Sequence, residues 1–283
     1  MATPDQSPLN PSNKAILGKL FTHPSNDTAS HLVRVLSTAS GIDSTLLLVG
    51  YSLNLVSDQL NKLLELEVRA ITERFAANAS KTLLPGETVI AKIPVPGITT
   101  RVVNLRNSTK ILSGMCSDVR AFMRLWGLLK MWLLARATYF NPPKDTVLKN
   151  IAWGQILSIS GYYALEHGFY LAGKGVYKWQ PEEIAKTFRT SIYAYGLYLI
   201  LDYARLYRES QLEEQKPASE KMDPTKKEVA DRQWHKALQV DLGYSPLCFH
   251  WATPGGLFSD SVVGALGAFA GWASFKEAWK QTA

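Results

Sequence analysis

The sequence predicts an all-α, membrane-associated protein with an amphipathic interfacial helix and short membrane segments toward its C-terminus. Apolar residues recur at three- and four-residue spacings along most of the 283 residues. One basic stretch separates its apolar and cationic side chains onto different arcs of a helix. A Gly-rich apolar segment lies close to the end of the chain. Together these features favour helices that meet a lipid surface over a soluble α/β fold.

Pro- and Gly-rich stretches divide the chain into regions. In chain order we expect a polar tail (1–12), an N-terminal helical region (13–80), a Pro/Gly-rich connection (81–100), a basic amphipathic helix region (101–140), an aromatic-rich helical membrane region (145–207), a charged loop (208–245) and a C-terminal membrane segment (246–283). Within the first helical region, Gly41-Ile42-Asp43 followed by Ser44 and Thr45 predicts the end of one helix and the cap of the next.

The positive charge lies in the first half of the chain. Residues 1–150 hold 17 Lys and Arg against 10 Asp and Glu, whereas residues 151–283 hold 14 of each. Nucleic acid and anionic lipid both attract a basic protein. Because the cations lie among apolar and aromatic residues, and no nucleic-acid-binding motif is present, we expect anionic membrane lipids as partners and no nucleic acid.

Residues 102–126 have the pattern of an amphipathic helix. On a helical wheel their apolar side chains fall within about 140°, and most basic and small polar ones within about 80° on another side. This pattern is typical of a helix lying in a membrane surface, although a helix packed on a protein core is the alternative. We predict a lipid-binding basic face of Arg106, Lys110, Arg120 and Arg124. The predicted membrane-inserting apolar face consists of Leu105, Leu112, Met115, Val119, Phe122, Met123 and Trp126.

No window reaches 20 clean apolar residues, so no transmembrane helix is strongly predicted. The best candidate is Ser261–Phe275, in which Gly264, Gly267 and Gly271 would let a second helix approach closely. We expect these glycines to pack helices together and to support a homo-oligomer. Ile151–Leu165 and Ser191–Leu201 are weaker candidates, for which a buried soluble core is nearly as good an interpretation.

The sequence offers no catalytic constellation. The five histidines share no motif, and H-E-x-x-H, a phosphate-binding loop, G-x-S-x-G and G-x-G-x-x-G are all absent. We therefore expect no enzyme activity, no catalytic residues, no cofactor and no metal site.

Two segments carry a family resemblance. His31–Leu46 (HLVRVLSTASGIDSTL), followed by LLVGY, resembles the N-terminal signature of the peroxin-11 family, and Leu105–Gly114 (LRNSTKILSG) resembles that family's second motif. The similarity covers approximately residues 28–275 and is greatest to the divergent fungal branch, peroxin-11C. Ser44 stands where the family usually has Lys, and the Arg expected after Thr45 is absent.

The resemblance implies a peroxisomal membrane protein that elongates peroxisomes and promotes their proliferation and division. It also implies self-association, delivery by the import receptor peroxin-19 and contact with the peroxisome fission machinery. Two alternatives stay open. One is a channel for small metabolites, with Glu166, His167 and Asp202 along a polar path. The other is a soluble protein that grips a partner with its basic helix.

Overall fold

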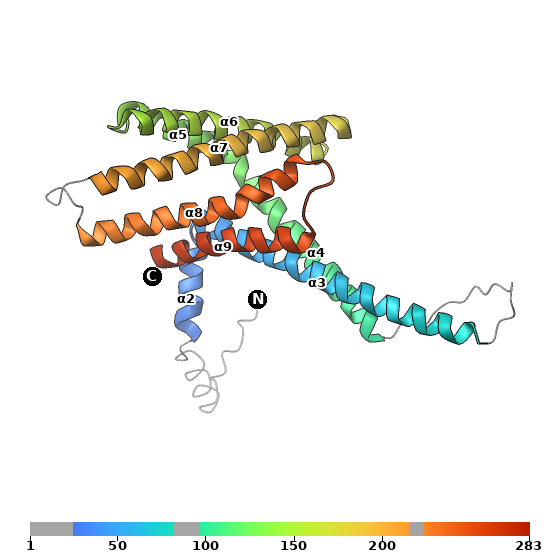
Figure 1. The fold of residues 1–283 in the computed structure, drawn as a ribbon. Helices are drawn as coiled ribbons and strands as arrows, with labels where there is room; N and C mark the ends of the chain where they lie inside the picture. Colours follow the sequence, from blue (N-terminus) through green and yellow to red (C-terminus); the bar gives the residue numbers. More distant parts are fainter. Residues whose placement is uncertain (1–24, 82–96, 216–222) are drawn as a thin grey trace, which may run out of the picture.

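The structure, a computed structural model, describes residues 25–81, 97–215 and 223–283, and these ranges are helical with short connections (Figure 1). The predicted all-α class is confirmed, since no strand occurs in the described ranges. The elements are α2 (Ser25–Leu36), α3 (Ala39–Ala79), α4 (Gly97–Met123), the short 3-10 helix η1 (Arg124–Trp126), α5 (Gly127–Phe140), α6 (Thr146–Gly173), α7 (Pro181–Gln215), α8 (Pro224–Ala252) and α9 (Asp260–Gln281). The predicted tail 1–12 and most of the connection 81–100 lie outside the described residues.

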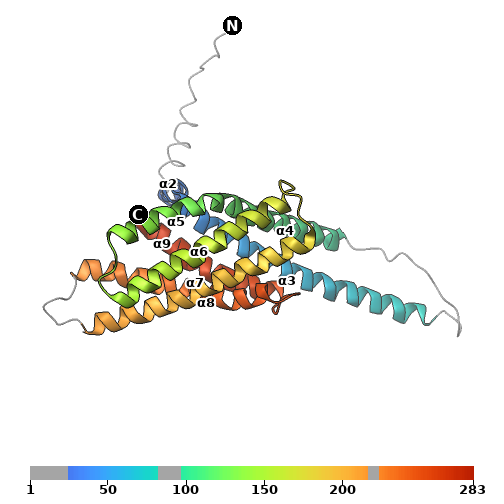
Figure 2. The ribbon, with the colours of Figure 1, turned by 90° about the horizontal axis from the view of Figure 1, so that it is seen from above.

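The helices form two groups joined by α4 (Figure 1). α5, α6 and α7 pack together in one group, and α3, α8 and α9 pack together in the other. α4 starts beside α3 and runs obliquely to α5, while α7 and α8 connect the groups a second time. Seen from above, α6, α7 and α8 run along a similar direction, and α3 extends well beyond the other helices (Figure 2).

The break between α2 and α3 lies earlier than predicted. Thr38 caps α3, because its hydroxyl accepts a hydrogen bond of 3.0 Å from the backbone N–H of Gly41. Gly41 is therefore inside the first turn of α3. A Cβ there would lie 2.0 Å from the carbonyl oxygen of Val35, so the glycine permits the tight turn between the helices. The prediction took this glycine for a helix end.

The charged loop predicted at 208–245 is wrong. α7 continues to Gln215 and α8 begins at Pro224. Local charges hold these helices, since Arg205 pairs with Glu209 one turn along α7 and Arg208 reaches Asp145 at the start of α6 (2.7 Å). Asp223 caps α8 with Pro224 at its first position. Balanced charge without apolar periodicity resembled a loop, but here it lines exposed helical faces.

The glycines of the C-terminal apolar segment pack α9 against α3 of the same chain. A Cβ on Gly264 or Gly271 would come within 2.7–2.9 Å of the backbone of Leu55 or Leu48, and Gly267 lies under the ring of Tyr51. The close approach predicted for a second copy is thus made within the chain. Self-association stays a prediction.

Membrane crossing by a single helix finds no support in the described residues. None of their helices is by itself long and apolar enough to cross a membrane. The segments Asp27–Leu36 and Ala39–Ala79 meet that criterion only as a pair, bent by 107°. The buried core is small and aromatic-rich where α7 meets α8, with Ile192, Leu199 and Cys248 packed against tyrosines and Trp251.

Candidate membrane-contacting site

α4 packs on α3 through small and polar residues. A Cβ on Gly50 of α3 would lie 3.0 Å from the Cβ of Cys116, which marks the closest approach of the two helices. The hydroxyl of Ser113 donates to the carbonyl of Gly50 (2.8 Å), and that of Ser57 donates to the carbonyl of Arg106 (3.3 Å). The face of α4 that meets the protein is therefore its polar face.

Ion pairs fix this polar face at both ends. Arg124 makes a bidentate pair with Glu166 of α6, through contacts of 2.7 Å from Nη2 to Oε1 and 2.9 Å from Nε to Oε2. The Glu166 side chain is only 5% exposed and also accepts from the hydroxyl of Tyr162. Such a buried carboxylate requires a matched cation, because an unpaired charge in a low-dielectric site is costly.

Two further cations of the predicted basic face pair with other helices. Arg120 Nε lies 2.9 Å from Oδ1 of Asp43 on α3, and Lys110 Nζ lies 2.7 Å from Oδ2 of Asp260 at the start of α9. Arg106 is half-buried, and its Nε has no hydrogen-bond partner among the described residues. The basic face is thus directed toward the protein, and not outward as the lipid-binding prediction required.

The opposite, apolar side of α4 is exposed. Leu105, Phe122 and Trp126 keep 53%, 55% and 64% of their surface accessible. This outer face of α4 consists of Leu105, Ile111, Leu112, Met115, Val119, Phe122 and Trp126. Of the predicted membrane-inserting residues, Met123 alone is half-buried. The helix thus exposes its apolar side and pairs Lys110, Arg120 and Arg124 within the chain, and insertion of the apolar side into a membrane stays a prediction.

α5 also exposes an apolar face, and exposed cations lie on α5 and just beyond it. Its outer face consists of Leu129, Trp132, Leu133, Tyr139 and Phe140, all exposed. Arg136 lies among them, with its guanidinium 5.9 Å from the ring centre of Trp132 and 6.0 Å from that of Phe140. Lys130, Arg136, Lys144 and Lys149 are exposed and form no ion pair with any described residue.

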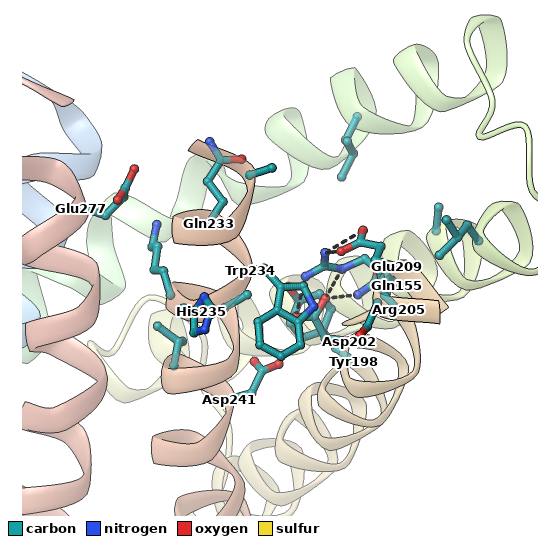
Figure 3. A pocket seen from close by; sticks show the side chains of 18 of the residues that line it. Gln155, Tyr198, Asp202, Arg205, Glu209, Gln233, Trp234, His235, Asp241 and Glu277 are labelled. Carbon is teal, nitrogen blue, oxygen red and sulfur yellow. Dashed lines mark hydrogen bonds and ion pairs between the residues drawn. The ribbon is translucent and has the colours of Figure 1, made fainter. Parts of the chain in front are cut away.

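A cleft of about 1430 Å³ opens between α5–α7 and α8–α9 (Figure 3). On its wall, Asp202 of α7 accepts hydrogen bonds from Gln155 (2.6 Å) and Arg205 (2.7 Å). Asp241 of α8 lines the same cleft, and its Oδ2 is buried without a hydrogen-bond partner among the described residues. Burial, and then the nearby Asp202 carboxyl, raise the pKa of Asp241 to about 8.

The comparison with known families supplies the identity. The sequence model described as peroxisomal biogenesis factor 11 (PEX11) matches residues 101–279, which is more than half of the chain. The chain belongs to the PEX11 family. No curated protein and no solved structure gives a match. The matched region runs from α4 into the last turns of α9 and so contains the outer faces of α4 and α5.

Membership makes this chain a peroxisomal membrane protein involved in peroxisome proliferation. The expected peroxin-11 resemblance and localisation are therefore confirmed, whereas the fungal peroxin-11C branch is not resolved. The alternative of a soluble interaction protein is set aside. PEX11 is a family of biogenesis factors and is not known as a family of enzymes. Within the described ranges, no group of three or more His, Cys, Asp or Glu could hold a metal ion.

The structure distributes the residues of the channel alternative over two adjoining cavities. Asp202 lines the cleft and Glu166 lines a second cavity beneath α4, and the two share Ile159, Tyr163 and Tyr195 in their walls. His167 hydrogen-bonds to the carbonyl of Arg124. The sequence interpretation missed the counter-ions Asp43, Glu166 and Asp260. A basic helix face that carries no acid, together with isolated carboxylates at the ends of apolar helices, is the signal that could have found them.

Proposed function

We propose that this PEX11-family protein promotes peroxisome proliferation by inserting the outer faces of α4 and α5 into one leaflet of the peroxisomal membrane. The observation that carries the proposal is the orientation of α4, whose apolar side is exposed while its basic side is ion-paired within the protein. Water opposes such exposure, because burying one large apolar side chain is worth about 1.5–3 kcal/mol. A lipid leaflet removes that cost for both helices.

Curvature follows from area. Side chains that enter only one leaflet increase its area relative to the other leaflet. The membrane then curves, and the expanded leaflet lies on the convex side. The ion pairs of Arg120 and Arg124 then act inside the protein, where they keep α4 oriented with its apolar side out. A helix that could roll would hide its apolar face against α3 and α6, so rigidity of this attachment is part of the mechanism.

The cations proposed to meet lipid phosphates lie on α5, in the turn after it and in the first turn of α6. Lys130, Arg136, Lys144 and Lys149 are exposed, and the sequence holds no acidic residue between Asp118 and Asp145. Each cation near an anionic surface contributes about 1 kcal/mol. Arg136 can keep its aliphatic stem among the aromatic rings while its head reaches the phosphates. Anionic lipid thus remains the expected partner, with different residues contacting it.

The test uses full-length protein and liposomes. Phe122→Ser with Trp126→Ser should lose binding and tubulation at every salt concentration, because the apolar contribution to binding is removed and salt does not restore it. Both side chains are exposed, so the variant should unfold at the same temperature as wild type. The matched control, Leu66→Ser with Phe249→Ser, changes exposed apolar residues of α3 and α8 and should tubulate normally. Unchanged tubulation by the α4 variant refutes the proposal.

A second pair of variants tests the cations. Changing Lys130, Arg136, Lys144 and Lys149 to Gln should remove the preference for anionic liposomes, and high salt should abolish the same preference in wild type. The control removes equally many exposed cations elsewhere: Arg74, Lys186, Lys226 and Lys227. Equal losses in both variants would show that net charge alone matters.

We further propose, from family membership, that the protein self-associates, is delivered by peroxin-19 and contacts the fission machinery. Crosslinking and co-purification of tagged full-length protein test these partners. An apolar face of α4 and α5 that occupies lipid leaves the helices α7 and α8 free for them. If one of these partners does not co-purify or crosslink, the proposed contact with that partner is wrong and the other two are unaffected.

A further inference from the structure

A second cavity lies beneath α4, and we call it the inner cavity. It measures about 690 Å³ and is lined by residues of α3, α4, α6, α7, α8 and α9. Sites for small molecules commonly measure about 300–1,000 Å³. The inner cavity is separate from the membrane-contacting faces, since those lie on the outer sides of α4 and α5.

Two arginines present unused donors to this cavity. A guanidinium carries five N–H donors. Arg120 uses Nε for Asp43, and Arg124 uses Nε and Nη2 for Glu166. No other acceptor among the described residues takes their remaining N–H groups. Both side chains line the inner cavity and are only 12% and 27% exposed, so these donors are available mainly from within it.

Two phenols add neutral donors. Tyr51 and Tyr244 line the inner cavity, and their hydroxyls have no hydrogen-bond partner in the described part of the chain. The ring of Tyr51 is held in place over Gly267, and both Arg120 and Arg124 are close enough to act on its pKa. Burial nevertheless raises the pKa of Tyr51 above its usual value, so the hydroxyl keeps its proton and can donate.

The rest of the lining sets the shape of a ligand. Each cation of the lining already has a carboxylate partner, Asp43 for Arg120, Glu166 for Arg124 and Asp260 for Lys110, so a preference for anions comes from the unused guanidinium and phenol donors. Apolar side chains complete the wall: Leu46, Leu47, Ile159, Phe188, Ile192 and Trp251. A small hydrated ion would leave these apolar side chains unused, and a neutral apolar molecule would leave the guanidinium and phenol donors unpaired.

We infer that the inner cavity binds an amphipathic anion, whose carboxylate or phosphate is held by Arg120, Arg124, Tyr51 and Tyr244 and whose apolar part packs against the remaining wall. Guanidinium groups suit both head groups, because they donate two parallel hydrogen bonds to either. The inference is independent of the membrane-shaping proposal, since none of these four residues belongs to the outer faces of α4 and α5.

Calorimetric titration of full-length protein in non-ionic detergent tests the inference. The probes share an eight-carbon chain: octyl phosphate, octanoate and octylammonium. Wild type should bind one or both anions and not octylammonium, and the stronger of the two anions identifies the head group. Tyr51→Phe with Tyr244→Phe keeps both rings and removes two donors, so binding should weaken by roughly tenfold. Tubulation of liposomes by this variant should equal that of wild type.

The control variant, Tyr193→Phe with Tyr207→Phe, removes two phenols that are 62% and 67% exposed, and it should bind the probes as wild type does. Three outcomes overturn the inference. Wild type binds no anion, or it binds octylammonium equally well, or the Tyr51/Tyr244 variant binds as tightly as wild type. The last two would mean that the probes coat the exposed apolar surface.

Discussion

The contact between α9 and α3 predicts that Gly→Ala substitutions destabilise the protein at this contact and stabilise it in open parts of other helices. Gly264 and Gly271 lie on the face of α9 that touches the backbone of α3. Gly161 and Gly196 lie in α6 and α7, and a Cβ on either meets nothing within 4 Å. Replacing each pair by Ala makes the same chemical change, two added methyl groups in helices, in two different surroundings.

The distances set the size of the effect. A Cβ on Gly271 would lie 2.8 Å from the Cα of Leu48, and one on Gly264 would lie 2.7 Å from the backbone N of Leu55. Non-bonded carbons attract best at about 3.5–4.0 Å, so α9 must move away from α3. Overpacking of this kind costs about 1–3 kcal/mol. One shift relieves both contacts, and the two costs therefore do not add fully.

The control pair should change stability in the opposite direction. Ala is favoured over Gly inside a helix by about 0.5–1 kcal/mol, so Gly161→Ala with Gly196→Ala should stabilise the protein. Urea unfolding of full-length protein in non-ionic detergent, followed by circular dichroism, measures both free energies. The reasoning fails if the α9 variant is as stable as the control variant, because the glycines would then not be needed for close packing.

Two other predictions concern buried carboxyls. Glu166→Gln should destabilise the fold by about 3–5 kcal/mol because Arg124 loses its buried partner, whereas Glu73→Gln, which breaks the exposed pair with Arg69, should change stability by less than about 1 kcal/mol in the same urea assay. A pKa of about 8 for Asp241 exceeds that of an unfolded Asp, about 3.9, so its contribution to stability is complete below about pH 4 and is lost as the pH rises through 8. Asp241→Asn needs no proton, and its melting temperature should fall less than that of wild type between pH 5 and pH 8. Parallel curves would contradict the raised pKa of Asp241.

Much of the helical fold could be predicted from the spacing of apolar residues and from the positions of Gly and Pro. α5 stops at Phe140, directly before Asn141-Pro142-Pro143, where these residues predict a helix end. The predicted single helix is instead broken at η1, where nothing in the sequence except Gly127 marks the change. Pro246, the expected first residue of the C-terminal membrane segment, lies inside α8. Proline removes one helix hydrogen bond, and tertiary packing can outweigh that loss.

The candidate site could be predicted only in part. The separation of apolar and basic arcs on α4 follows from residue order alone. Which arc faces the protein does not follow, because the answer depends on Asp43, Glu166 and Asp260, which come from three other helices. From the sequence, the cations of this helix were expected to contact lipid phosphates. Carboxylates of the same chain, held at 2.7–2.9 Å, satisfied them instead.

The pairing of α9 with α3 bears on how the chain reaches this fold during synthesis. The backbone N–H of Ser261 bonds to Asp58, 203 residues earlier, and α3 has its α9 contacts only after α9 has left the ribosome. Contacts so distant along the chain form late and slowly. Until then the backbone of α3 around Tyr51 stays uncovered and prone to association with other chains. Covering of α3 therefore waits for the synthesis of α9, and a chaperone that shields α3 in that interval would act before the protein meets its membrane.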